Sequence, residues 1–176
     1  MDDVDVLVVA FTGDDAPGLV HALAEVVSDH GGNWESSHMV SWHGVFAGTL
    51  VVSAERDRCE ALAEDLRALD GMLQVTVHHA SGTPERPHAQ SLHLDVVGGD
   101  HPGIVEDIAA AIARPRVNVR CLDSESRPAA ADGAHEFHVH AELEVGADVD
   151  VAAWGEELRS RGEAVGVTVD LVPVED

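Results

Sequence analysis

The chain has 176 residues, a formal net charge of −23 at pH 7 and ten basic residues, all of them arginine. A negative field of this size repels phosphate, so we expect neither direct nucleic-acid binding nor binding to an anionic membrane. The two cysteines, the lack of a basic and apolar leader and the lack of a membrane-spanning apolar run together predict a cytoplasmic protein without a disulfide framework.

One turn motif, Asp-x-Pro-Gly, occurs twice, within residues 13–20 and residues 98–105. Each copy follows a short apolar run that suits one strand. Each copy also precedes apolar residues at i, i+4, i+7 and i+8, which line one face of a helix. The aspartate of the motif is followed at the same distance by an asparagine: 18 residues separate Asp15 from Asn33, and 18 separate Asp100 from Asn118. Motif and spacing together predict an internal repeat.

The elements follow the same βαββαβ order in both halves of the chain, which is the order of the ferredoxin-like unit. In the first unit, residues 1–79, we expect strand Val4–Phe11, a helix with Pro17 in its first turn that ends at Gly31-Gly32, strands Trp34–Trp42 and Val45–Ser53, helix 55–69 and strand Met72–His79. In the second unit, residues 91–176, we expect strand Ser91–Val97, helix Pro102–Ala113, strands Val117–Arg127 and His135–Val145 around a small-residue loop at Pro128–Gly133, helix 148–161 and strand Val165–Pro173.

Residues 80–90 form the predicted linker, because they combine glycine and prolines with no apolar period. The fold class is therefore α+β, with two tandem units that each have an antiparallel four-stranded sheet.

The repeated turn has the chemistry to hold a zwitterion. The first turn of a helix presents unpaired backbone N–H groups and the positive end of the helix dipole, which suit a carboxylate or a phosphate. Asp15 and Asp100 could bind an ammonium group, and we expect Asn33 and Asn118, which enter the next strand, at the same end of the sheet. An α-amino acid carries both charges side by side. The alternative is that Asp before Pro-Gly is an ordinary helix start with the aspartate as its cap.

The motif Asp-x-Pro-Gly-[Leu/Ile]-Val after an apolar strand, followed by an asparagine that opens the second strand, resembles the ACT domain. Two such units in one chain resemble the group of glycine cleavage system transcriptional repressors. The resemblance implies regulatory units that bind an amino acid or another small effector, commonly at an interface between two units, and that act through a protein partner. It implicates these residues: Asp15, Pro17, Gly18, Leu19 and Asn33 in the first unit, and Asp100, His101, Pro102, Gly103, Ile104 and Asn118 in the second. His101 stands where the first unit has Ala16, so the two turns need not bind the same ligand.

The sheet faces that the helices leave open differ between the units in the predicted pattern. The first face is apolar, with Val6, Val8, Ala10, Val45, Ala47, Thr49 and Val51. We expect the second unit or another subunit to cover such a patch. We also predict a homo-oligomer such as a dimer. The second face is ionisable, with His93, Asp95, Glu136, His138, His140 and Glu142.

A metal site is the remaining chemical candidate, because histidines at i and i+2 of a strand share a face and histidine nitrogen is a common ligand. The candidates His93, His138 and His140 are weighed against a plain solvated face in a chain with 12 histidines. We expect a non-enzymatic regulatory protein with no cofactor that binds a small amino-acid effector. The resemblance to the repressor group suggests glycine or another small amino acid, and the sequence itself does not choose between them. The alternatives are an interaction module whose turns are helix caps, and a metal-dependent enzyme that uses these histidines.

Overall fold

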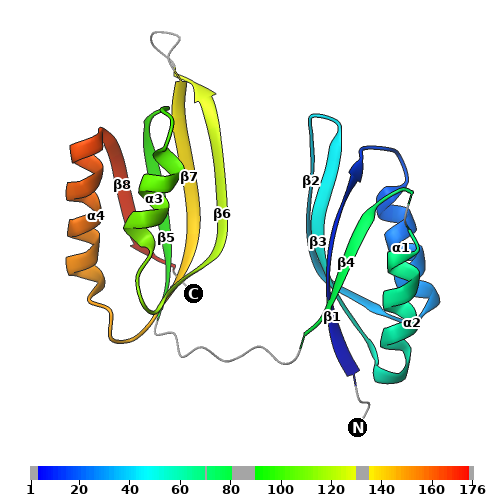
Figure 1. Ribbon diagram of the computed structural model, residues 1–176. Helices are drawn as coiled ribbons and strands as arrows, with labels where there is room; N and C mark the ends of the chain where they lie inside the picture. Colours follow the sequence, from blue (N-terminus) through cyan, green and yellow to red (C-terminus); the bar gives the residue numbers. More distant parts are fainter. Residues whose placement is uncertain (1–3, 70, 81–89, 130–134, 175–176) are drawn as a thin grey trace. The chain divides into compact units, whose positions relative to one another are not determined.

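The computed structural model describes residues 4–69, 71–80, 90–129 and 135–174, and the chain divides into two compact units (Figure 1). The division falls between Pro84 and Glu85. Most of the expected linker at 80–90, and the greater part of the expected loop at 128–133, lie outside the described residues. Within the ranges given, no helix is long and apolar enough to cross a membrane.

The first unit has the predicted βαββαβ order. Its elements are β1 (Val4–Asp14), α1 (Leu19–Asp29), β2 (Asn33–Trp42), β3 (Val45–Glu55), α2 (Arg56–Arg67) and β4 (Gln74–His79). The strands form an antiparallel sheet in the order β2-β3-β1-β4, and both helices lie on one face of it (Figure 1). The expected α+β, ferredoxin-like architecture is confirmed for this unit.

The second unit repeats this architecture. Its elements are β5 (Gln90–Gly99), α3 (Ile104–Ile112), β6 (Val117–Pro128), β7 (His135–Val145), α4 (Val151–Val165) and β8 (Val167–Pro173). The sheet order is β6-β7-β5-β8, again antiparallel. The last helix is shifted towards the C-terminus relative to the expected 148–161. It begins after Asp150, whose carboxylate accepts a hydrogen bond from the Ala153 N–H, and it ends at Gly166, where φ is +78°.

The core of the first unit lies between the sheet and both helices. As the alternation predicts, Leu7, Val9 and Phe11 face the helices and are 0–4% exposed. Phe11 stacks on Phe46 of β3, with ring centroids 5.6 Å apart, and α1 packs against α2. Leu66 of α2 is fully buried in this cluster. Large side chains therefore fill the space beneath the two helices.

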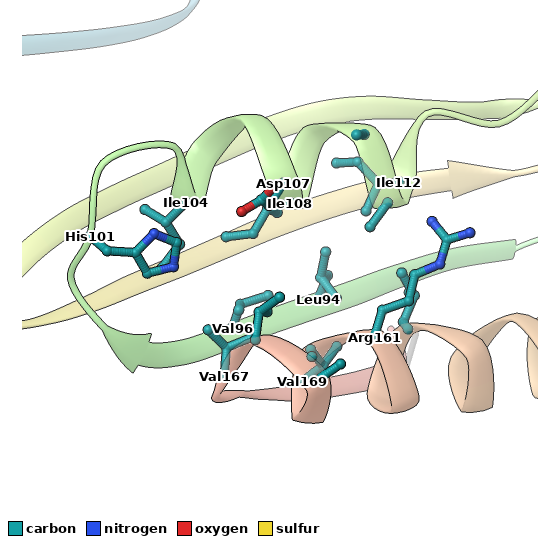
Figure 2. Close-up of a pocket in the computed structure, with 16 residues that line it drawn as sticks. Leu94, Val96, His101, Ile104, Asp107, Ile108, Ile112, Arg161, Val167 and Val169 are labelled. Atoms are coloured by element: carbon teal, nitrogen blue, oxygen red, sulfur yellow. The ribbon is translucent and has the colours of Figure 1, made fainter.

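The core of the second unit has a smaller side chain than the first at one position of its central strand. Val96 of β5 lies four residues before Asp100, as Phe11 lies four residues before Asp15. The apolar cluster joins the sheet to α3 and α4, with Ile108 and Leu158 from the two helices. A pocket of about 350 Å³ remains between α3 and α4 (Figure 2). The two units thus share a topology but differ in how their helix layer is packed.

Candidate ligand-binding turns

The two Asp-x-Pro-Gly turns have nearly the same backbone. Gly18 has φ of +96° and ψ of −5°, and Gly103 has φ of +96° and ψ of −9°. Only glycine adopts this left-handed conformation without strain, so both turns require it. Each glycine is the N-cap of its helix, and neither helix start has a side-chain cap. The aspartates are therefore not helix caps, which contradicts the alternative interpretation of the motif.

The motif's aspartates are held by a serine instead. The Ser41 hydroxyl donates to Oδ2 of Asp15 at 2.6 Å, and the Ser126 hydroxyl donates to Oδ2 of Asp100 at 2.6 Å. The backbone N–H groups of the two aspartates donate to the carbonyls of Gly44 and His135, at 2.8 and 2.9 Å. These bonds attach each turn to the adjacent strand pair. They orient a carboxylate that is still exposed to solvent.

The two serines are functional candidates that motif reasoning missed. Ser41 and Ser126 each lie 26 residues after their aspartate. That equal spacing is visible in the sequence and is the signal that identifies them. The second turn differs in one respect: His135 Nδ1 lies 3.2 Å from the Ser126 hydroxyl oxygen, so an imidazole joins the aspartate and serine there.

The surface beside each turn is open. A Cβ built on Gly18 or Gly103 meets no atom within 4 Å, and Pro17 and Pro102 are exposed. Leu19 and Ile104 behave differently, because their side chains are only 5% and 4% exposed and pack in the core. The predicted contribution of these last two residues to a ligand is thus limited to their backbone.

His101 is a predicted residue of the second unit that has no counterpart among the predicted residues of the first. It is half-buried, and its Nδ1 lies 3.2 Å from the Pro102 carbonyl oxygen. Its ring also lines the pocket between α3 and α4 (Figure 2). Ala16 of the first unit offers no comparable group.

The asparagines do not lie at the same end of the sheet as the aspartates, and that expectation was wrong. Asn33 pairs with Ser53, which also pairs with Val6 near the start of β1. Asp15 follows the far end of β1. About 26 Å of strand rise therefore separates the row of Val6 and Asn33 from the end of β1 at Asp14. The second unit has the same arrangement, because Asn118 pairs with Glu144, opposite Ser91. The helix between the two strands returns the chain to the end where β1 began.

Each asparagine side chain donates a hydrogen bond to a carboxylate at the end of the sheet where β2 or β6 begins. Asn33 Nδ2 donates to Glu35 Oε1 at 2.8 Å, and the Ser53 hydroxyl donates to the same oxygen. The Ser53 bond, with the Asn33 bond second, holds the pKa of Glu35 below its usual range. Asn118 Nδ2 donates to Glu144 Oε2 at 3.2 Å. Asn33 is exposed, whereas Asn118 is half-buried.

The open face of the second sheet carries histidines beside carboxylates. His140 Nδ1 lies 2.8 Å from Asp95 Oδ1, and the His140 ring meets the His93 ring edge-on at 5.1 Å. His93 Nε2 lies 3.9 Å from Glu142, and His138 Nε2 lies 3.6 Å from Glu136. Among the described residues, no three His, Cys, Asp or Glu side chains form a group that could hold a metal ion. The candidates His93, His138 and His140 are therefore members of His–carboxylate pairs.

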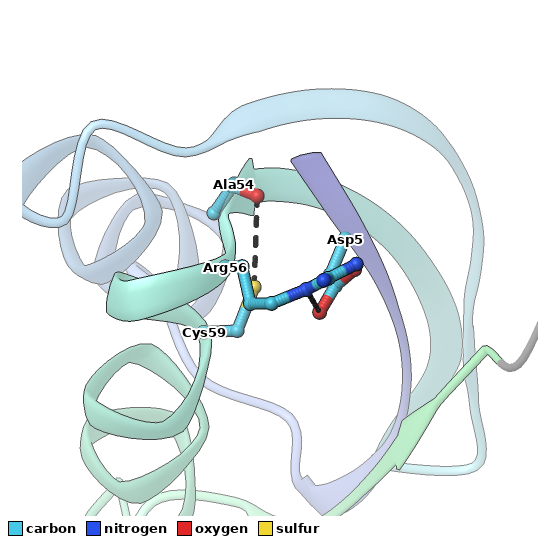
Figure 3. Close-up of polar contacts among 4 residues, drawn as sticks. All are labelled: Asp5, Ala54, Arg56 and Cys59. Atoms are coloured by element: carbon cyan, nitrogen blue, oxygen red, sulfur yellow. Dashed lines mark hydrogen bonds and ion pairs between the residues drawn. The ribbon is translucent and has the colours of Figure 1, made fainter. Parts of the chain in front are cut away.

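Neither cysteine has the setting of an activated nucleophile. Cys59 is buried, and its thiol donates to the Ala54 carbonyl oxygen at 3.6 Å (Figure 3). Burial raises the pKa of this thiol. Desolvation and the Asp123 carboxylate raise the pKa of the Cys121 thiol. A raised pKa leaves little thiolate at neutral pH.

Known proteins resemble this chain in sequence and in fold. Residues 5–80 match the ACT domain family. The chain is 26% identical over 149 residues to the glycine cleavage system transcriptional repressor of Escherichia coli (strain K12), covering 83% of this chain and 78% of that protein. The repressor of Shigella flexneri gives the same values. The family match covers the first unit, and the second unit repeats the same element order and sheet order.

Two solved structures extend the likeness over both units of the chain. A crystal structure of an unknown protein from Galdieria sulphuraria has a TM-score of 0.84 and 27% identity, covering 98% of this chain and 99% of that one. A crystal structure of a protein named after the same repressor has a TM-score of 0.70 and 18% identity, with 98% and 99% coverage. The second likeness is one of fold. The matched relatives are named as transcriptional repressors.

Proposed function

We propose that this protein is a non-enzymatic regulator that binds a small amino acid at its two turns and transmits ligand occupancy to a protein partner. The observation that carries the proposal is the same in both units: an exposed, serine-held aspartate beside an uncapped helix start. The uncapped N–H groups and the helix dipole suit the carboxylate of the ligand. The aspartate suits its ammonium group. The ligand class follows from these two charges lying one carbon apart in an α-amino acid.

A complete site needs more than one unit if the asparagines take part. Within a unit, Asn33 lies about 26 Å of strand rise from the turn that holds Asp15. A ligand can contact both kinds of residue only where the strand start of one unit meets the turn of another. That second unit belongs to the same chain or to another copy. Ligand binding would then strengthen one arrangement of the units, which is the requirement for coupling.

The open face of the first sheet supports self-association as part of this function. Its outward residues include apolar side chains on three neighbouring strands, interspersed with polar ones such as Thr12, Thr49 and His38: Val6, Val8 and Ala10 on β1, Val45, Ala47 and Val51 on β3, and Val40 and Trp42 on β2. Trp42 is 67% exposed and Val45 is 46% exposed. Exposed apolar side chains grouped on one face favour contact with another protein surface. We propose a homodimer that uses it.

The protein partner is inferred from charge and from the relatives together. The relatives are named as transcriptional repressors of the glycine cleavage system, yet a chain with a net charge of −23 repels DNA. Control of transcription by this protein would therefore pass through a second protein that contacts DNA. We propose a cytoplasmic role in regulating amino-acid metabolism, with glycine as the first ligand to test.

Thermal-shift screening of the full chain against the amino acids and against divalent metals separates the candidate functions. Binding stabilises the native state by RT ln(1 + [L]/Kd), so about 100 Kd of ligand adds about 2.7 kcal/mol. We expect glycine or another small amino acid to raise Tm. A shift with metal ions alone would favour the histidine face, and no shift with any compound would contradict the proposed function.

Charge-removing variants then locate the ligand. Asp15→Asn combined with Asp100→Asn should weaken amino-acid binding at least about tenfold, because each change removes a charge-assisted contact. Asp14→Asn is the matched control, since Asp14 is an exposed neighbour on the same strand end. Calorimetric titration measures both. Unchanged affinity in the double variant would show that the ligand binds elsewhere.

A further inference from the structure

The pocket in the second unit lies between its two helices and is lined mainly by aliphatic side chains (Figure 2). Val96 of β5 and Val169 of β8 form its floor, and Ile108 of α3 and Leu158 of α4 form its walls. Its volume is about 350 Å³, which lies within the range of roughly 300–1,000 Å³ of small-molecule sites. A dry space of this size lined by CH₂ and CH₃ groups favours a hydrocarbon group.

Two substitutions relative to the first unit lie at this pocket. Phe11, which is buried in the first core, is replaced by Val96 at the same distance before the turn. Leu66, fully buried in α2, corresponds to Arg161 when both helices are counted from their first residue. A phenyl ring and a leucine side chain of the first unit are thus replaced by a smaller and a charged side chain that line the pocket. Arginine at the second position places a guanidinium at the pocket.

Gly162 brings α4 close to β8 beside the pocket. A Cβ at this residue would lie 2.7 Å from Val169 Cγ2 and 2.9 Å from the Val167 carbonyl oxygen. The absence of a side chain therefore lets α4 approach β8 closely. Gly162, Val167 and Val169 all line the pocket, so this close contact forms one side of it. The pocket follows from close packing at Gly162 and from the small Val96.

Two guanidinium groups lie at the end of the pocket formed by Arg161, on the side of α4 away from Asp107 of α3. Arg161 lines the pocket and pairs with Glu157 at 2.8 Å, and the same carboxylate also pairs with Arg114. Two guanidinium groups thus share one carboxylate, in a chain whose net charge is −23. In Figure 2 the Arg161 side chain extends from α4 towards the end of α3 near Ile112. An anionic group that reaches this end of the pocket would meet a cation that is only partly neutralised.

We propose that this pocket binds a small amphipathic carboxylate, with its hydrocarbon body between α3 and α4 and its carboxylate on Arg161. The apolar floor and the guanidinium at one end match the two parts of such a molecule. This site is separate from the turn sites, and its existence does not depend on them. His101 lines the pocket and belongs to the second turn, so an occupied pocket would contact the turn at one residue.

A chain-length series of saturated carboxylates, from butanoate to decanoate, tests the proposal by calorimetric titration of the full chain below micellar concentrations. Affinity should rise about fourfold per added methylene and stop rising once the chain outgrows the pocket. Octylamine and octanol serve as controls and should bind at least about tenfold more weakly than octanoate, because neither bears an anion. Equal binding of all three octyl compounds, or no binding, would overturn the proposal.

Two substitutions assign the binding to this pocket. Val96→Phe introduces the residue of the first unit and should abolish octanoate binding. Arg161→Gln, at an exposed position that leaves the core intact, should weaken it at least about tenfold. Arg159→Gln is the matched control, because Arg159 also pairs with a glutamate of α4, Glu156, and does not line the pocket. Octanoate affinity that survives both pocket substitutions would contradict the site.

A carboxylate at the rim of the pocket determines whether the pocket accepts a ligand that carries an amino group. Asp107 lines the pocket, and no ion pair involves it in the described part of the chain. Leucine and 4-methylpentanoate share a branched body and differ by the ammonium group. If leucine binds more tightly, Asp107→Asn should remove the difference, and the pocket takes an amino acid. If 4-methylpentanoate binds at least as tightly, the ligand is a simple carboxylate. Binding of neither, together with no binding of octanoate, would refute the pocket without affecting the turn sites.

Discussion

The two units share the backbone and the polar contacts of the turn. They differ in the packing beneath the helices and in the open face of the sheet. Gly18 and Gly103 agree within a few degrees in φ and ψ, and both aspartates accept a serine hydroxyl at 2.6 Å. Beneath the helices, Phe11 fills a core that Val96 leaves partly empty. A duplicated fold tolerates changes in core volume more readily than changes in the backbone of a turn that must hold a polar group in place.

The open sheet faces differ as strongly. The first carries valines, alanines and Trp42, whereas the second carries histidines and carboxylates such as the His140–Asp95 pair. The first face is suited to permanent burial. The second remains compatible with water, because its histidines and carboxylates are polar and lie in pairs. We therefore expect substitutions on the two faces to have unequal consequences.

The largest expected effect comes from emptying the filled core. Phe11→Ala should cost about 3–5 kcal/mol of unfolding free energy, because it removes a buried ring that stacks on Phe46. Val96→Ala should cost clearly less, since Val96 already borders a pocket. Chemical unfolding followed by tryptophan fluorescence measures both, with Trp154 reporting on the second unit. Equal losses would contradict the difference in packing.

The next effect concerns the apolar face. Val8→Glu should weaken self-association at least tenfold, or about 1.4 kcal/mol, because it places a charge in the proposed interface. Val20→Glu is the control, since Val20 is an exposed valine on α1, away from that face. Sedimentation velocity across a dilution series gives the dissociation constants. An unchanged oligomeric state and stability for Val8→Glu would exclude this face from the contact.

A smaller and symmetric effect is expected at the turns. Gly18→Ala and Gly103→Ala should each destabilise the protein by about 1–2 kcal/mol, because alanine is strained at positive φ. Gly99→Ala is the comparison: its added Cβ meets no atom within 4 Å, and its φ is not positive. That variant should stay within about 0.5 kcal/mol of the wild type. Unequal losses at the two turns would show that their backbones differ in solution.

The smallest effect is a pH dependence confined to the first unit. A hydrogen bond from Arg56 to Asp5 lowers the pKa of that carboxyl (Figure 3). A lowered folded-state pKa gives stability that is present above the unfolded-state value and is lost as the pH falls through the folded-state value. Gln90 takes the place of Asp5 in the second unit.

We therefore expect Arg56→Gln to flatten the loss of stability of the first unit below about pH 4, near the unperturbed pKa of aspartate. Acid unfolding monitored by circular dichroism measures this loss. Arg67→Gln, which removes an exposed arginine at the other end of α2, should leave the curve unchanged. Identical acid unfolding of wild type and Arg56→Gln would show that the pair adds nothing to stability.

The architecture followed from the sequence because alternation and spacing report local periodicity. Leu7, Val9 and Phe11 face the helices as alternation requires, and the repeat predicted two units of one order. Element ends were less accurate: α1 begins at Leu19, two residues after Pro17, because the left-handed Gly18 is its N-cap. Such ends depend on single backbone conformations, which a periodic pattern does not specify.

The site was predicted only in part, because distance along the chain does not indicate distance in space. Asn33 was expected beside Asp15, but the helix between them returns the chain to the other end of the sheet. Ser41 was missed because it lies on another strand, and only its repetition at Ser126 identifies it in the sequence. The pocket depends on the close packing at Gly162, which no pattern of apolar residues reveals.

The most direct measurement is an amide NMR titration of the full chain with the small amino acid that gives the largest thermal shift. The account predicts that the backbone amides of Gly18 and Leu19, or of Gly103 and Ile104, move first and saturate with the calorimetric Kd. Gly166, a glycine of positive φ at the end of α4, should not move. An amino acid that binds while all four turn amides stay in place would contradict the account.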